Sequence, residues 1–301
     1  GSVTGSGTFT IFENVVTGHD NCTGKAVIPN GVEAIAAYAF SGASGLTSVT
    51  IPASVTSILN NAFAWNQSLT AVEFISAIDP LTIDPLVIQE SAFRGTGITS
   101  IEIPANVTFI GISSFSYSYS LTSVTFASGS TLETIGDYAF VGASSLSSIR
   151  IPASVKSIGK SAFEQSESLY SVTFAPGSTL ETIGESAFAW TPLVSIRIPA
   201  SVTSIGNSAF SGTAIYTATF ASPRASPLTI GDYAFSNLEN LVSIQIPASV
   251  TSIGKGAFEY AYSLVSVTFA SASTLQTIGE SAFRGTRLVV IEIPASVISI
   301  G

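Results

Sequence analysis

The chain has 301 residues, of which 46% are apolar and only 10% are charged, and its net charge at neutral pH is −9. It contains no run of 18 uninterrupted apolar residues, so we expect no membrane insertion. The acidic balance argues against nucleic acid or an anionic membrane as a partner, because both are bound through basic patches.

Residues 1–25 lack the pattern that fills the rest of the chain, and we predict that they form an N-terminal cap. Repeat proteins need such an atypical unit to cover the first exposed edge of their core. Within it, Thr8 to Phe12 alternates polar and apolar residues, which predicts a strand. The single cysteine, Cys22, excludes an internal disulfide; we expect a small buried residue there, the alternative being a reactive thiol.

From residue 26 onward, a Val/Ile-rich run followed by an Ala-Phe or Ser-Phe pair recurs along the chain. The phenylalanines lie 22 to 25 positions apart, except for one gap of 30. They are Phe40, Phe63, Phe93, Phe115, Phe140, Phe163, Phe188, Phe210, Phe235, Phe258 and Phe283. A unit of this size cannot bury its own apolar face, so residues 26–301 are predicted to form a solenoid of about 12 coils. The last coil stops at Gly301 before its Ala-Phe pair, and we expect it to be truncated.

Each coil opens with a strand whose apolar residues lie two apart, as Val49 and Ile51 do, while Ser48 and Thr50 point to the other face. The proline that follows, here Pro52, lacks an N–H group and is expected to end the strand. A glycine usually follows the next core isoleucine, and we expect it to turn the chain through a positive φ. The fold class predicted is a β-rich repeat solenoid, wound as a right-handed coil, with one long parallel sheet. The opposite side is expected to consist of short extended or 3₁₀ pieces, with little α-helix.

The recurring strings IPASVxSIGxxAF and LxSVTFAxxSTLxTIGxxAF resemble the BspA-like leucine-rich repeats over about residues 26–301. The resemblance implies a leucine-rich-repeat solenoid that is extracellular or displayed on the cell surface. It also implies a non-enzymatic protein, often an adhesin that binds host or matrix partners, with no catalytic residues to carry over. The identity of the partner, an extracellular protein or a glycan, is left open.

The outward-facing positions of the predicted sheet form the first candidate binding surface. Between the two core residues of each strand, threonine is the commonest residue of this column, with acidic residues toward both ends and two arginines near the middle. A partner with a negative patch could bind the arginines; the alternative is a merely hydrophilic face. The residues assigned to this surface are Ser123, Thr125, Arg150, Thr173, Arg197, Thr219 and Gln245.

Two further features could bind a partner. Two positions beyond the repeat phenylalanine, some coils carry an aromatic residue where most carry glycine or a polar residue: Trp65, Tyr117, Trp190 and Tyr260. Aromatic side chains on a solenoid edge can stack on sugars or anchor a protein, although packing between coils also explains them. Residues 75–85 lengthen one coil and contain two Asp-Pro pairs, typical of a projecting insertion.

Three positions before the phenylalanine, acidic residues alternate with Lys160, Asn207 and Lys255 in successive coils. The acidic members are Glu90, Asp137, Glu185, Asp232 and Glu280. We expect ion pairs between neighbouring coils rather than a metal site, because a cation needs several converging oxygen ligands. The only histidine is His19, and no zinc, phosphate or dinucleotide motif occurs, so we predict no catalytic residue, metal or cofactor.

These features favour a non-enzymatic recognition or adhesion module that binds a protein partner through the sheet face. Two other classes stay open. One is a structural spacer or lattice element that associates end to end through its truncated last coil. The other is a glycan-binding or, less favoured, an ice-binding repeat surface.

Overall fold

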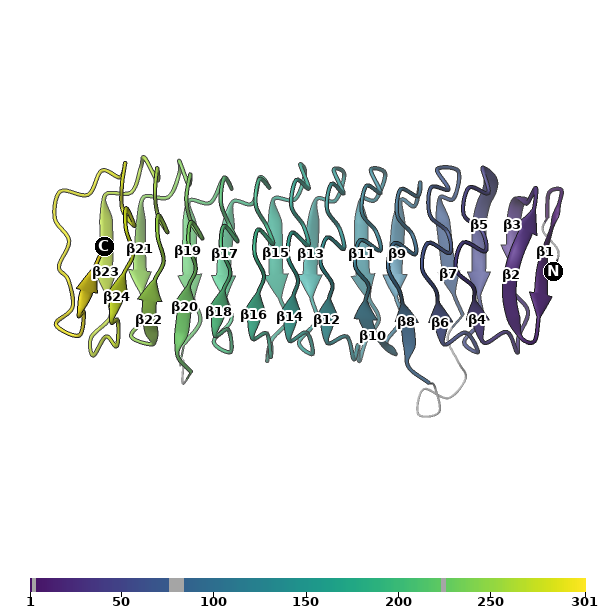
Figure 1. Cartoon of the computed structure of the whole chain (residues 1–301), viewed down its shortest axis with the longest axis horizontal. Coiled ribbons are helices and arrows are strands. Elements are labelled where there is room, and N and C mark those ends of the chain that lie inside the picture. Colours follow the sequence, from purple (N-terminus) through teal and green to yellow (C-terminus); the bar gives the residue numbers. More distant parts are fainter. Residues whose placement is uncertain (2–3, 76–83, 223–225) are drawn as a thin grey trace. The chain divides into compact units, whose positions relative to one another are not determined.

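The computed structural model describes residues 1, 4–75, 84–222 and 226–301, and these contain strands and turns but no helix. They form two compact units, unit 1 (residues 1–149) and unit 2 (residues 150–301), each of which is a stack of coils (Figure 1). The predicted fold class, a β-rich repeat solenoid, is confirmed. The insertion predicted at residues 75–85 falls mostly on residues 76–83, outside the described part of the chain.

Most coils contribute one strand to each of two lines, which we call the front line and the back line. The strand that precedes the proline, or the equivalent SVTF segment, belongs to the front line. In unit 1 the front line is β3 (Thr23–Val27), β5 (Gly45–Ile51), β7 (Ala71–Phe74), β9 (Ser100–Ile103) and β11 (Ser123–Phe126). The back line is β2 (Val15–Asp20), β4 (Ala34–Ile35), β6 (Ser57–Ile58), β8 (Leu86–Ile88), β10 (Val107–Ile110) and β12 (Thr134–Ile135).

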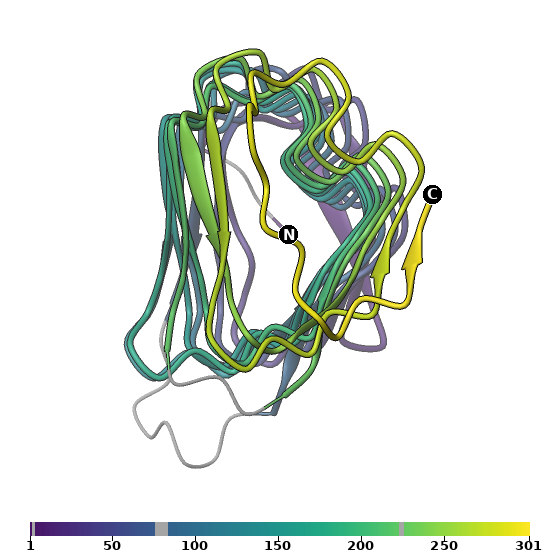
Figure 2. The ribbon, with the colours of Figure 1, turned by 90° about the vertical axis from the view of Figure 1, so that its left-hand side faces the viewer.

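Unit 2 begins within the front strand β13 (Ser148–Ile151) and repeats the same arrangement. Its front line continues with β15 (Ser171–Phe174), β17 (Ser195–Ile198), β19 (Thr217–Phe220), β21 (Ser243–Ile246) and β23 (Ser266–Phe269). The back line is β14 (Ser157–Ile158), β16 (Thr182–Ile183), β18 (Ser204–Ile205), β20 (Leu228–Ile230), β22 (Val250–Ile253), β24 (Thr277–Ile278) and β25 (Ser299–Ile300). Figure 2 is a view down the stack of coils, and it shows the front and back lines of unit 2 on opposite sides of each coil.

The back line corrects the expectation of a single long sheet with an irregular opposite side. Its strands pair in parallel through short ladders, such as Ser204 with Thr229 and Ile205 with Ile230 between β18 and β20. The Ser/Thr-Ile pair before the coil's glycine is extended, with the isoleucine buried and its neighbour turned outward. A run this short carries too little alternation to be recognised as a strand from the sequence.

Ladder length in the front line depends on the number of residues per coil. In unit 2, β17 and β19, which begin 22 residues apart, and β21 and β23, which begin 23 apart, each pair over four residues. Across the longer coil from Ser171 to Ser195, only that one pair forms. Between β19 and β21, both fully described, no ladder forms, and the separation from Thr217 to Ser243 is 26 residues. Extra residues at the corner after the SVTF strand therefore interrupt the front sheet of unit 2.

The repeat phenylalanines stack into a column inside each unit. In unit 1, consecutive rings from Phe40 to Phe140 are 5.1 to 5.3 Å apart, and in unit 2 those from Phe163 to Phe283 are 5.2 to 5.5 Å apart. The rings are nearly parallel, and such offset-stacked geometry adds to the apolar area that each ring buries. The column is the core that the spacing predicts.

The corners on either side of each phenylalanine adopt the left-handed conformation, two positions before it and two positions after it. Around Phe188, for example, Ser186 and Trp190 have φ values of 53° and 58°. The glycine after the core isoleucine, predicted to turn in this way, does not have a positive φ. It is required for a different reason: a Cβ on Gly206 would lie 2.6 Å from backbone atoms of Gly184 and Glu185 in the neighbouring coil.

The N-terminal strand predicted from residue 8 to residue 12 is observed as β1 (Thr8–Phe12), which pairs antiparallel with β2. Phe9 of β1 packs edge-on against Phe40, the first ring of the column, with the centroids 5.5 Å apart. Cys22 is buried, as predicted, and its thiol donates a hydrogen bond to the Thr8 carbonyl. These contacts cover the start of the stack; the division into a cap of residues 1–25 and repeats over 26–301 stays a prediction.

Candidate binding surfaces

The front face of unit 2 carries most of the residues predicted for partner binding. In β17, Ile196 and Ile198 are buried while Arg197 between them is exposed, which is the alternation that the sequence predicts. Thr173, Thr219 and Gln245 occupy the same outward position in their strands. Arg150 occupies it in β13.

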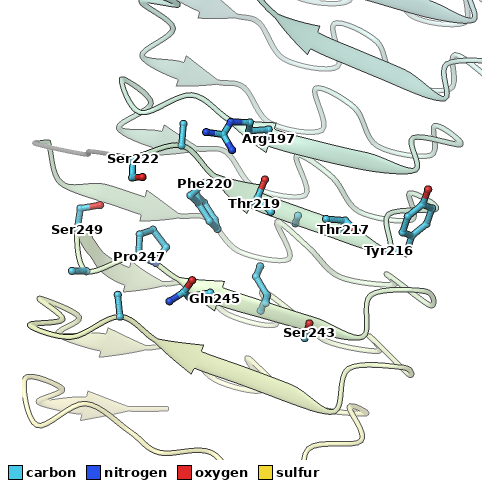
Figure 3. A pocket seen from close by; sticks show the side chains of 15 residues that line it. Arg197, Tyr216, Thr217, Thr219, Phe220, Ser222, Ser243, Gln245, Pro247 and Ser249 are labelled. Carbon is cyan, nitrogen blue, oxygen red and sulfur yellow. The ribbon is translucent and has the colours of Figure 1, made fainter.

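Arg197, Thr219 and Gln245 are brought together at the interruption between β19 and β21 (Figure 3). They line an open hollow of about 680 Å³, together with Phe220, Pro247 and other residues of the two strands and the corners that follow them. The hollow exists because the ladder is missing there, so it results from the long coil between these strands. Sequence reasoning selected the three polar residues but missed the hollow and its apolar wall.

The two predicted arginines differ from several other basic residues of the chain in their partners. Lys25, Lys160, Lys255 and Arg284 all form ion pairs with carboxylates of other coils. Among the described residues, neither Arg150 nor Arg197 has a carboxylate within ion-pair distance. Their charges are therefore available to a partner.

Other members of the predicted surface lie elsewhere. Ser123 and Thr125 are on β11 of unit 1, where Thr125 pairs in register with Glu102 of β9. At the start of that unit, Glu73 accepts hydrogen bonds from Thr50 and Lys25, at 3.1 and 3.4 Å, so part of the outward column is satisfied internally. The structure gives no common site for the unit 1 and unit 2 residues.

The four predicted edge aromatics share one geometry. Trp65, Tyr117, Trp190 and Tyr260 all have left-handed φ values, and each ring lies against the glycine at the equivalent corner of the next coil. Those glycines are Gly95, Gly142, Gly212 and Gly285. The absence of a side chain at these glycines makes room for the rings. Packing against the next coil therefore buries one face of each aromatic ring.

An arginine covers three of these four rings. The Arg94 guanidinium lies 5.1 Å from the Trp65 ring centroid and 5.3 Å from that of Tyr117, and Arg284 lies 5.6 Å from that of Tyr260. These are cation–π distances. Both arginines directly follow a repeat phenylalanine, a signal visible in the sequence once the aromatic of the preceding coil is aligned with them.

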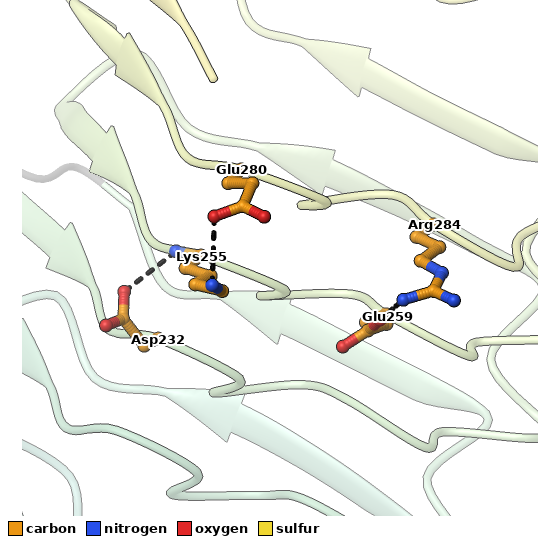
Figure 4. Close-up of polar contacts among 5 residues, drawn as sticks. All are labelled: Asp232, Lys255, Glu259, Glu280 and Arg284. Atoms are coloured by element: carbon orange, nitrogen blue, oxygen red, sulfur yellow. Dashed lines mark hydrogen bonds and ion pairs between the residues drawn. The ribbon is translucent and has the colours of Figure 1, made fainter.

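The predicted charge column forms ion pairs between coils. Lys160 pairs with Glu185 at 3.0 Å and Lys255 with Glu280 at 2.9 Å, while Asp232 accepts a hydrogen bond from the Lys255 backbone (Figure 4). The hydrogen bond to Glu280 raises the pKa of Lys255, and the same bond lowers the pKa of Glu280. The ion pairs expected between neighbouring coils are confirmed for Lys160 and Lys255.

Reactive groups are few in the described part of the chain. No group of three or more His, Cys, Asp and Glu side chains there could hold a metal ion, and no helix long and apolar enough to cross a membrane is found there. Burial raises the pKa of the Cys22 thiol, which keeps it protonated and unreactive.

The stacked coils, the glycines at their corners and the buried phenylalanine column define a leucine-rich-repeat solenoid. A family model described as a BspA type leucine rich repeat region matches in six copies, over residues 17–82, 87–217 and 228–301. The chain therefore belongs to the BspA-type leucine-rich-repeat family.

Solved structures with the same fold support this assignment. A leucine-rich repeat protein from Bacteroides ovatus is 23% identical over 98% of this chain and 88% of its own, with a TM-score of 0.62. The pneumococcal vaccine antigen PcpA is 20% identical over 99% of this chain and 94% of its own, with a TM-score of 0.52. Among curated proteins, none matches the chain.

Proposed function

We propose that the chain is a non-enzymatic recognition or adhesion module of an extracellular or cell-surface protein, and that it binds a protein partner through the front face of unit 2. The observation that carries the proposal is Arg197, an exposed arginine without an internal carboxylate at the rim of the hollow between β19 and β21.

The chemistry of this face suits an acidic, flat partner surface. A guanidinium presents several N–H donors in a planar fork, which matches a carboxylate in two parallel hydrogen bonds. Thr219 and Gln245 add neutral donors and acceptors around the hollow, and Phe220 and Pro247 add apolar area. Because the strands are held by stacked coils, little ordering cost opposes binding.

Family membership supports the proposed location and the absence of enzymatic activity. The family resemblance implies a surface-displayed protein, and the structurally similar PcpA is described as a pneumococcal vaccine antigen. Cys22 is buried, and the described residues offer no metal cluster, which leaves little chemistry for catalysis.

The test is a binding screen against extracellular-matrix proteins, a glycan panel and whole cells. The double variant Arg150→Ala, Arg197→Ala is compared with Lys160→Gln, Lys255→Gln, which removes the same amount of charge from the ion-pair column. We expect a saturable protein hit whose affinity falls at least tenfold in the arginine variant and is unchanged in the lysine variant. Equal affinity for both variants would overturn the proposal, and a hit confined to glycans would favour the glycan-binding alternative.

A further inference from the structure

The two tryptophans of the chain occupy equivalent corners, one in each unit. Each follows a repeat phenylalanine by two positions, with φ values of 64° for Trp65 and 58° for Trp190. A Cβ on Gly95 would lie 2.4 Å from Cε3 of Trp65, and a Cβ on Gly212 would lie 2.4 Å from Cε3 of Trp190. The same edge of each indole therefore rests on the same backbone.

The neighbours of the two rings also correspond. The backbone N–H of Trp65 donates to the carbonyl of Arg94, and the backbone N–H of Trp190 donates to the carbonyl of Ser211, so Arg94 and Ser211 hold the same place in the next coil. At the equivalent position, directly after the repeat phenylalanine, the preceding coil carries alanine and the following coil carries serine in both units. In unit 1 these are Ala64 and Ser116, and in unit 2 they are Ala189 and Ser236.

The side chain at this place differs between the units, and so does the residue at the following corner, which is Tyr117 in unit 1 and Asn237 in unit 2. In unit 1, the Arg94 guanidinium lies between the Trp65 and Tyr117 rings, and its Nε is buried without a hydrogen-bond partner among the described residues. The rings, rather than a carboxylate, therefore hold this cation. In unit 2, the Ser211 hydroxyl shares a 2.8 Å hydrogen bond with the Ser236 hydroxyl, and this short side chain brings no cation to the indole.

Trp190 is exposed and has no cation over its ring. It is 56% exposed, close to the 53% of Trp65, but no arginine or lysine of the described chain lies over it. The coil on its other side contains Glu164 and Glu167, and the Gln165 N–H of that coil donates to the Ala189 carbonyl beside Trp190. The coil that precedes Trp65 contributes only Ser, Gly and Ala at the corresponding positions 41–44. The coil next to Trp190 thus carries two carboxylates at these positions, which the coil next to Trp65 lacks, and this negative charge favours a cation nearby.

We propose that Trp190 is an acceptor site for an arginine side chain of a partner protein, whose guanidinium takes the place over the indole that Arg94 takes over Trp65. The chain itself supplies the template for this contact, because the equivalent corner of unit 1 holds a guanidinium 5.1 Å from the indole centroid, there with Tyr117 as a second ring. The site lies at the edge of the coils and does not depend on the front-face arginines.

Indole N–H resonances of the full chain test the proposal directly, because the protein has only two tryptophans and each gives one signal. The probe is a hexaarginine peptide at physiological salt, with hexaglutamate as the charge control. We expect the Trp190 signal to shift saturably with hexaarginine while the Trp65 signal stays in place. An unmoved Trp190 signal, or equal shifts of both signals as in nonspecific attraction to an acidic protein, would overturn the proposal.

Two exchanges of the differing residue sharpen the test. Ser211→Arg should fill the site with an internal guanidinium and abolish the Trp190 shift, whereas Arg94→Ser should open Trp65 and make its signal respond. Trp190→Leu should weaken hexaarginine binding roughly three- to tenfold. A Trp190 shift that persists in a folded Ser211→Arg protein, or one produced by oligosaccharides and not by hexaarginine, would contradict an arginine site. The Arg150→Ala, Arg197→Ala variant should retain the Trp190 response, which separates this proposal from the front-face one.

Discussion

In unit 2, the inner column repeats one residue type in every coil, whereas the outward residues of the front face vary from coil to coil. Inside, every coil repeats a phenylalanine whose ring lies against the rings of its neighbours. On the front face, the outward position changes from Thr173 to Arg197 to Gln245 without any internal contact that requires these residues. Packing between coils requires the phenylalanines, whereas it does not require the outward residues of the front face, which can therefore serve recognition. The comparison predicts that stability and binding can be altered separately.

The largest loss of stability is expected from the column. Phe188 is completely buried, and its ring centroid lies 5.3 Å from that of Phe163 and 5.4 Å from that of Phe210. Phe188→Ala removes both contacts and leaves a cavity, so we expect the free energy of unfolding to fall by about 3 to 5 kcal/mol. Chemical denaturation measures it. Phe283→Ala, at a half-buried ring in the last coil, is the matched control and should cost less; equal losses would contradict a column that acts through its neighbours.

A smaller loss is expected where coils touch through their backbones. Gly206→Ala would place a methyl group 2.6 Å from Glu185 N, and backbone cannot move aside as a flexible side chain can. We expect about 1 to 3 kcal/mol of destabilisation. Gly18→Ala serves as the control, because a Cβ there meets nothing within 4 Å. A neutral Gly206→Ala would show that the coils are less closely stacked than described.

The ion-pair column should give a modest, pH-dependent effect. The contribution of Glu280, whose pKa is lowered in the fold, is present above the pKa of the unfolded carboxyl group and is lost as pH falls through the lowered value. The contribution of Lys255, whose pKa is raised, is lost only when pH rises through that raised value. Melting temperatures of the unmodified protein and Lys255→Gln should therefore differ near neutral pH and converge at strongly acidic pH. A difference that persists in acid would contradict this origin, and high salt should also reduce it.

The front face should give the smallest effect on stability. Arg197→Ala removes an exposed side chain with no ion pair to a described residue, so the free energy of unfolding should change by less than about 0.5 kcal/mol. Thermal unfolding of this variant beside Phe188→Ala tests the comparison. A loss of several kcal/mol at Arg197 would mean that the arginine has a structural role.

Much of this fold could be predicted from the sequence because its main determinants recur at fixed offsets. The phenylalanine spacing predicted the core column, and the prolines after Ile51, Ile103 and Ile151 marked the ends of front strands. The charge alternation predicted the pairing of Lys255 with Glu280. Each of these signals rests on one residue type repeated coil after coil.

What could not be predicted depends on how one coil lies on the next. The close approach at Gly206 and the position of Arg94 between two rings come from contacts between residues more than 20 positions apart. The hollow beside Arg197 requires the failure of a ladder between β19 and β21, which follows from coil length rather than from any one residue. Such effects appear only when neighbouring coils are compared position by position.

Arginine-selective dicarbonyl labelling, read peptide by peptide with and without the partner identified in the binding screen, tests the central claim most directly. The account predicts that Arg150 and Arg197 react readily in the free protein, because both are exposed and neither forms an ion pair with a described residue. Both should be protected in the complex, while the exposed Arg287 reacts equally in the two states. Full reactivity of Arg197 in a saturated complex would contradict recognition through the front face of unit 2.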